Sequence, residues 1–212
     1  NGTVPDGMLN GETVFMTDFN DGIIIDSAKV INGKFTFEGD VDEAMVVKLT
    51  LRNLYAEFIV EKGAISIDLS DPYGARGTPM NDKLNEFTTQ SANLILGARE
   101  KLADIDEAAS ETEKQELQGK IVDELFLNID ELPVSYLKEH PNDALGALIF
   151  YSWMQNQIEQ SSEKFNEASR HVGEYVLNFG PVKQMKEHYE KLYQAAVGKH
   201  FIDFTIEKGN QD

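Results

Sequence analysis

The pattern of apolar residues changes near residues 72–79, and this change constrains the fold more than any other feature of the sequence. Before it, short alternating or β-branched runs are separated by turn residues, and half of the 16 glycines lie within residues 1–76. After it, apolar residues recur at the spacing of an α-helix. The sequence therefore predicts an α+β chain, in which a small antiparallel β-sandwich or barrel precedes an α-helical part.

This change divides the chain into three predicted segments. Residues 1–76 form an antiparallel β domain, residues 77–197 form an α-helical region, and residues 198–212 turn extended again. We interpret the last segment as the first strand of a further domain that this chain does not include. Its apolar stretch, residues 201–206, is expected to be a mobile tail or to pair with another chain.

Six strands are expected in the β domain, at residues 12–18, 23–31, 34–38, 45–51, 55–61 and 64–70. The clearest turn is Asn32-Gly33, because both residues tolerate the positive φ angles of a type I′ hairpin turn. Phe35 and Phe37 then share one face of the strand that follows. Two more turns are expected, at Arg52-Asn53 and Lys62-Gly63.

Two long amphipathic helices are expected next. The apolar stripe of the first is Leu84, Phe87, Leu94, Ile95, Ala98, Leu102 and Ile105, and that of the second is Leu117, Ile121, Leu125, Ile129 and Leu132. We expect the first helix to begin near Met80 or Asn81, with Asn81 as its cap. Pro133 is expected to kink or interrupt the second helix, which ends at His140-Pro141.

The helix expected over residues 144–158 is apolar on nearly all sides, so we place it at the centre of the helical part. Asn142 is its expected cap, and Leu148 and Trp153 are expected to be largely buried. Two further helices are expected over about residues 163–177 and 182–196, separated by Gly180-Pro181.

The composition limits the partners and the chemistry of the chain. Its 37 acidic and 19 basic residues give a net charge of −18, which disfavours nucleic acid and an anionic membrane surface as partners. The absence of cysteine excludes disulfides, thiolate zinc sites and thiol catalysis within the chain. No apolar run approaches the ~18–20 residues that cross a bilayer.

Residue patterns indicate no catalytic, cofactor-binding or metal-binding site. The four histidines, His140, His171, His188 and His200, show no ligand spacing, and nucleophile-elbow, P-loop and dinucleotide motifs are absent. Residues 18–22, Asp-Phe-Asn-Asp-Gly, resemble a calcium loop only superficially, and we interpret them as a turn between two strands. We interpret Asp26-Ser27 as a bulge or a solvent-facing polar pair.

The aromatic residues are interpreted as core. Tyr151, Trp153 and Met154 lie on the apolar helix and are more often core there than the lining of a pocket. Tyr55, Phe58, Tyr73 and Phe87 are not expected to form a carbohydrate-stacking platform, because positions 55 and 58 of a strand do not share a face.

Four segments, taken together, resemble one family. They are the opening Gly-x-Val-Pro-Asp-Gly followed by residues 25–39, then Gly-Thr-Pro-Met-Asn at 77–81, Tyr-Leu-Lys-Glu-His-Pro-Asn at 136–142, and Val-Gly-Lys-His-Phe-Ile-Asp-Phe at 197–204. In this order and spacing they resemble the DUF4369 domain of Bacteroidetes envelope thiol–disulfide oxidoreductases of the TlpA/ResA type, in the AhpC/TSA-redoxin family. The last segment resembles the lead-in to the thioredoxin-like domain of those proteins.

The resemblance implies that this chain is the non-catalytic N-terminal region of such an oxidoreductase, which positions the redox domain or mediates self-association or partner binding. In such proteins a Cys-x-x-Cys on the thioredoxin-like domain carries the chemistry, so no catalytic residue carries over to this cysteine-free chain. The implied partner is the thioredoxin-like domain of the same parent protein. The implied location is the periplasm or cell envelope, with export or a lipid anchor upstream of Asn1.

Two alternatives stay open at this point. One is a free-standing module that binds a peptide or a glycan, which an open pocket with convergent polar groups would favour. The other is a hydrolase that uses two carboxylates, which a cleft with perturbed acidic pKa values would favour.

Overall fold

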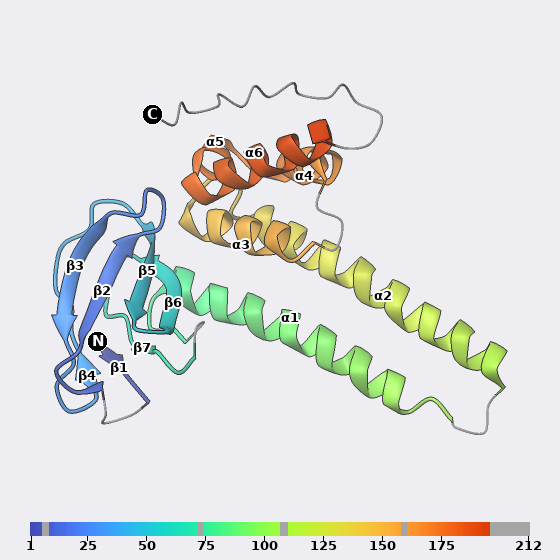
Figure 1. The fold of residues 1–212 in the computed structure, drawn as a ribbon, viewed down its shortest axis with the longest axis horizontal. Helices are drawn as coiled ribbons and strands as arrows, with labels where there is room; N and C mark the ends of the chain where they lie inside the picture. Colours follow the sequence, from blue (N-terminus) through green and yellow to red (C-terminus); the bar gives the residue numbers. More distant parts are fainter. Residues whose placement is uncertain (6–8, 72–73, 107–109, 158–160, 196–212) are drawn as a thin grey trace, which may run out of the picture.

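The computed structural model describes residues 1–5, 9–71, 74–106, 110–157 and 161–195. Within them, a β domain is followed by a long helical hairpin and a cluster of shorter helices (Figure 1). The strands are β1 (Gly2–Thr3), β2 (Thr13–Asp18), β3 (Ile24–Lys29), β4 (Lys34–Phe35), β5 (Met45–Leu51), β6 (Leu54–Val60) and β7 (Ile67–Asp68). The predicted α+β class is confirmed.

The β domain consists of two small sheets. Four strands in the order β3-β2-β5-β6 form an antiparallel sheet, and a second sheet has the order β4-β1-β7. The prediction of purely antiparallel strands is wrong at one place, because β1 pairs parallel with β7. The short strand β1 was not predicted, since a two-residue strand leaves no alternating pattern and its partners lie more than 30 residues away.

Two of the three predicted turns are confirmed, whereas Lys62-Gly63 is only a bend between β6 and β7, which belong to different sheets. Asn32 and Gly33 have φ angles of 53° and 74°, as a type I′ turn requires. The turn nevertheless joins strands of different sheets, and its hairpin is reduced to one bridge between Ile31 and Lys34. Arg52-Asn53 joins β5 to β6, where Leu51 pairs with Leu54.

The core of the β domain lies between the two sheets. Val14, Leu49 and Phe58 reach it from the four-stranded sheet, and Phe35 reaches it from the other sheet. The ring of Phe37 lies 5.9 Å from that of Phe35, which confirms that these two residues share a face. Tyr55 is half exposed whereas Phe58 is buried, so the expected separation of these two aromatic residues is also confirmed.

The helices are α1 (Pro79–Ala103), α2 (Glu111–Leu137), α3 (Ala144–Gln155), α4 (Ser162–Ala168), α5 (Glu174–Asn178) and α6 (Gly180–Ala195). Helices α1 and α2 form an antiparallel hairpin whose outer half projects away from the rest of the molecule (Figure 1). Helix α3 is buried on almost every side, as predicted, and α4, α5 and α6 cover it. Leu148 is buried as expected.

Two expectations about helix caps are wrong, each because another residue precedes the helix. Thr78 precedes α1, and Asn81 is buried inside the first turn with its amide bonded elsewhere. Asp143, not Asn142, caps α3 by accepting a hydrogen bond from the Gly146 amide at 2.9 Å. Pro133 does not interrupt α2, which runs to Leu137.

The helix expected over residues 163–177 is broken in the structure. Helix α4 ends at Ala168, a 3₁₀ turn covers Ser169–His171, and α5 begins only at Glu174. At the break, the Gly173 amide donates to the Pro141 carbonyl oxygen at 2.6 Å, and a β-carbon on Gly173 would overlap the side chain of Asn142. A tertiary contact therefore overrides the helical pattern of this segment. The extended segment expected at residues 198–212 lies outside the described residues, and the division at residues 76 and 197 stays a prediction.

Candidate functional site

The first joint between the β domain and the helices is made by Asn81. Its buried side chain accepts from the Ile59 amide at 3.0 Å and donates to the Ile59 carbonyl oxygen at 2.7 Å. Next to it, the Met80 amide donates to the Glu61 carboxylate at 2.8 Å. Because these bonds join the first turn of α1 to β6 and the residue after it, the direction of the long hairpin is fixed by the sheet.

The second joint lies at the turn between β2 and β3, the segment that resembles a calcium loop. In this turn Asp18 and Asp21 each accept a hydrogen bond from a backbone amide two residues on. Asn20 reaches out of the turn and accepts from the Gly180 amide at 2.7 Å. A β-carbon on Gly180 would overlap the carbonyl oxygen of Asn20, so this close approach requires glycine.

Aromatic contacts complete the second joint. The ring of Phe19 packs edge-on against Tyr151 of α3 at 5.5 Å and against Phe179 before α6 at 5.8 Å. The β2–β3 turn, α3 and the start of α6 are thereby held together. The interpretation of residues 18–22 as a turn is confirmed. The sequence did not indicate that this turn attaches the β domain to α3 and α6.

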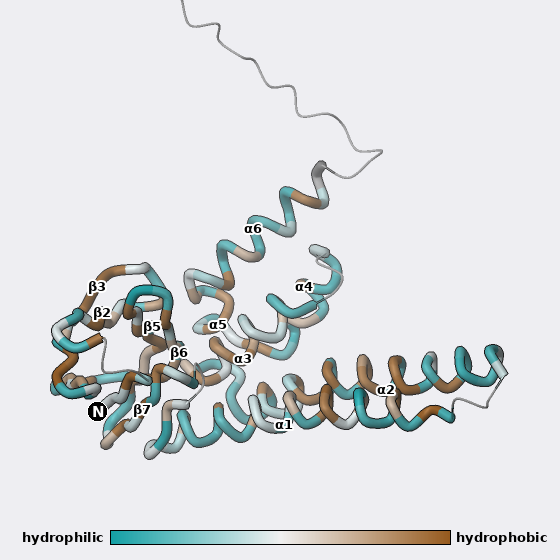
Figure 2. Tube along the Cα trace, turned by 60° about the horizontal axis from the view of Figure 1, so that its bottom comes forward, coloured by the Kyte–Doolittle hydropathy of each residue, from teal (hydrophilic) through white to brown (hydrophobic). Residues whose placement is uncertain are grey.

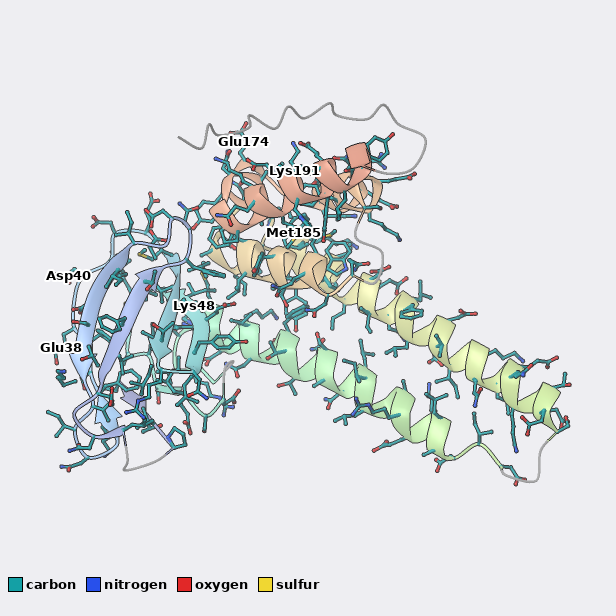
Figure 3. The ribbon with its side chains drawn as sticks, in the orientation of Figure 1. Glu38, Asp40, Lys48, Glu174, Met185 and Lys191 are labelled. Carbon is teal, nitrogen blue, oxygen red and sulfur yellow. The ribbon has the colours of Figure 1, made fainter. Side chains whose placement is uncertain are left out.

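A cleft of about 570 Å³ lies beside this second joint. Lys48 of β5 and Met185 of α6 are on its opposite walls (Figure 3). The Lys48 ammonium lies 3.0 Å from the Glu57 carboxylate and 4.6 Å from the centre of the Tyr55 ring. Burial, followed by the charge of Glu57, raises the pKa of the Tyr151 phenol. The cleft therefore holds a paired cation and a neutral phenol, which suits a structural seam better than acid–base chemistry.

A cavity of about 920 Å³ opens between the two sheets of the β domain. Its floor is apolar and includes Phe35, Leu49 and Phe58. Its mouth is acidic, with one lysine, and is lined by Asp26, Glu38, Asp40, Asp42, Glu61 and Lys62. Glu38 and Asp40 lie at the outer edge of the domain, away from the helices (Figure 3). This arrangement suits an apolar ligand that carries positive charge.

A third cleft, of about 590 Å³, lies among α2, α3 and α4. Trp153 lines it with part of its surface but is mostly buried and packs against the core of the helical part, so the expected burial of Trp153 is confirmed. The indole Nε1 donates to Asp130 at 3.1 Å. That bond explains the position, because a tryptophan N–H needs a partner and Asp130 lies at the rim of the cleft.

The histidines are placed apart from one another. Nδ1 of His140 lies 2.7 Å from the Asp143 carboxylate at the start of α3, His171 lines the Trp153 cleft, and His188 lines the cleft beside Lys48. His200 lies outside the described residues, as does Tyr73. Asp26 follows a register shift between β2 and β3, close to the expected bulge.

Among the described residues, two carboxyl groups have lowered pKa values, and both groups take part in local turn or helix-cap structure. A hydrogen bond from the Ser70 backbone lowers the pKa of Asp68 in the turn after β7. The Ser110 hydroxyl lowers the pKa of Glu113 in the capping box of α2. A general acid needs a raised pKa, so neither supports the hydrolase alternative.

Within the described ranges, no three His, Cys, Asp or Glu side chains are grouped so that they could hold a metal ion. None of the helices in those ranges is both long and apolar enough to cross a membrane.

Comparison with known proteins gives one match. Residues 1–84 match the family model described as Domain of unknown function (DUF4369). The matched region comprises the whole β domain and the first turn of α1, including the joint at Asn81. No curated protein and no solved structure matches the chain.

Proposed function

We propose that this chain, whose first 84 residues are a DUF4369 domain, is the non-catalytic N-terminal region of a cell-envelope thiol–disulfide oxidoreductase and holds the redox domain in a fixed position. The observation that carries this proposal is the double fastening of the β domain, to α1 through Asn81 and to the start of α6 through Asn20 and Gly180. A β domain that is bonded to the start of α1 and to the start of α6 is suited to holding these two helices in a fixed geometry.

The path of α6 supports the same role. Its first residue is bonded to the β2–β3 turn, and the Tyr189 hydroxyl donates to the Met154 carbonyl oxygen of α3 at 2.9 Å. The helix therefore leaves the β domain in a direction that two separate contacts determine. A thioredoxin-like domain that followed α6 would be attached to a helix whose direction is defined relative to the β domain.

The proposed setting is the periplasm, with the thioredoxin-like domain of the same parent protein as partner and a lipid anchor upstream of Asn1. This part of the proposal rests on the resemblance of residues 77–81, 136–142 and 197–204 to Bacteroidetes proteins of this type. The acidic surface, with a net charge of −18, agrees with a soluble envelope domain.

The reading frame beyond Asp212 tests the proposal. We expect it to encode a thioredoxin-like domain with a Cys-x-x-Cys motif. The isolated chain, having no cysteine, should give no turnover in an insulin-reduction assay even with excess dithiol. A frame without such a domain, or turnover above that of a cysteine-free control protein, would contradict the proposal.

The cavity between the sheets favours a second candidate function, that of a binding module. Its apolar floor and acidic mouth suit an extended peptide that alternates apolar and basic residues. Isothermal titration calorimetry with a peptide of alternating Lys and Phe should show binding to the parent chain. The Asp40→Lys variant should bind the same peptide more weakly. A Glu-Phe peptide of equal length is the control, and equal binding of both peptides would exclude this recognition.

A further inference from the structure

The outer half of the α1–α2 hairpin has an inner seam and two unlike flanks. The seam is formed by Leu94 and Ala98 of α1 and by Ile121 and Leu125 of α2, which are buried or half buried. Apolar residues occur along both helices out to this outer half (Figure 2). Among the elements that the structure describes, none packs extensively against the outer half of either helix, so its flanks face outward (Figure 1).

One flank, the polar flank, is identified by an ion pair, and it also carries one exposed apolar residue, Leu117, seven residues before Glu124. Lys101 of α1 bonds to Glu124 of α2 across it, with Nζ 2.9 Å from the carboxylate oxygens. Successive residues of a helix are 100° apart. Leu102, one residue after Lys101, and Phe126, two residues after Glu124, therefore lie beyond the seam on the other flank.

That other flank is apolar and exposed. Ile95 and Leu102 of α1 contribute to it, as do Val122 and Phe126 of α2, and we call these four residues the apolar flank. The exposed fractions are 42% for Ile95, 36% for Leu102 and 43% for Phe126. By the same helical geometry, Leu84 and Leu137 lie on this side of the hairpin near its base, where they are buried and α3 packs on both helices. The surface that α3 covers at the base thus continues uncovered toward the tip.

The apolar flank is free of carboxylates, although the chain carries 37 of them. In residues 88–102 and 115–129 the acidic residues are Glu100, Glu116, Asp123 and Glu124. Helical spacing places all four on the polar flank or on the outer faces of the helices. The one charged residue at the edge of the apolar flank is Arg99.

We propose that the apolar flank binds the apolar flank of a second copy of this chain, so that two hairpins form a four-helix bundle about a two-fold axis. A two-fold contact places the same patch on both partners. Two chains of charge −18 repel each other wherever carboxylates meet, and the apolar flank is a face on which they can approach without this penalty. A second copy therefore fits the flank in both apolar character and charge.

The size of the flank sets the expected affinity. Fifteen residues of helix give a length of about 22 Å, and two adjacent helices give a width of about 20 Å. The flat projection is then on the order of 450 Å², and the accessible area of protruding side chains is larger. Standard complexes bury about 800 Å² per partner, so we expect a dissociation constant in the micromolar range. This inference does not rest on the proposed function.

Sedimentation velocity over a concentration series tests the proposal on the full chain. We expect a reversible monomer–dimer equilibrium that Phe126→Glu weakens by at least tenfold. Leu127→Glu is the matched control, because Leu127 is 59% exposed but lies on the outer side of α2, and its variant should dimerise like the parent chain. Circular dichroism verifies that both variants keep their helices.

A second variant and the effect of salt keep the test independent of residue 126. Arg99→Glu places a carboxylate at the edge of the flank and should also weaken dimerisation by at least tenfold. Raising the salt concentration should strengthen the dimer, because it screens the repulsion between two acidic chains. A chain that stays monomeric at all concentrations, a dimer unaffected by both variants, or a flank that binds only a thioredoxin-like domain would overturn the proposal.

Discussion

At the scale of single residues, Gly180 carries the greatest constraint on the joint between the β domain and α6. We predict that Gly180→Ala destabilises the chain by about 1–3 kcal/mol, the range for forcing an extra methyl group into a packed contact, because the new β-carbon meets the Asn20 carbonyl oxygen. Urea denaturation measures the change. Gly119→Ala is the control: a β-carbon there meets nothing within 4 Å, and replacing a helical glycine should stabilise the chain by about 0.5–1 kcal/mol. Equal effects of the two variants would mean that the contact at Gly180 is not tight.

Tyr136 gives a prediction of pH dependence at the same scale. Burial, followed by the charge of Glu86, raises its pKa from 10 to about 12. The folded state thus holds the phenol proton more tightly than the unfolded state. The stabilisation is fully present below about pH 10 and is lost as the pH rises through about 12. Between pH 9 and pH 11, the free energy of unfolding should fall more in the parent chain than in Tyr136→Phe, and an equal fall would contradict this assignment.

At the scale of elements, Asn81 fixes α1 on β6. We predict that Asn81→Ala costs about 2–4 kcal/mol, because it leaves the buried amide and carbonyl groups of Ile59 without the partner they have here. Asn93→Ala, at an exposed position of the same helix, should change the free energy of unfolding by less than about 0.5 kcal/mol. Thermal unfolding of both variants distinguishes the loss of the buried hydrogen bonds from a change in helix propensity. An equal loss of unfolding free energy in Asn81→Ala and Asn93→Ala would show that the joint contributes little to stability.

The elements also show what the sequence could and could not predict. The hairpin turns at Asn32-Gly33 and Arg52-Asn53 and the apolar helix α3 were predictable, because their signals are local. Strand β1 and the break before α5 were not, since both depend on partners distant in the chain. The cavity between the sheets escaped prediction for the same reason: its lining is drawn from positions between 1 and 67. The burial of Trp153 was predictable from the apolar helix, but that pattern does not reveal which side of the residue borders a cleft.

At the scale of the whole molecule, the two joints make the β domain and the helices one body. The joint at Asn81 fixes the start of the helical part, and the joint at Gly180 fixes the start of its last helix. A chain held at both places has no hinge between its two parts. Both the proposed positioning role and the outward direction of the hairpin depend on this rigid connection.

A distance measurement between two spin labels by pulsed electron paramagnetic resonance tests whether the β domain and α6 are rigidly connected. Because the chain has no cysteine, labels can be placed at chosen sites without background labelling. The labels replace Ser27 on β3 and Lys191 on α6, both exposed, through Ser27→Cys and Lys191→Cys. We predict one narrow distance distribution, which broadens when Gly180→Val is added. A broad distribution in the parent background, or a distribution that Gly180→Val leaves unchanged, would contradict this prediction.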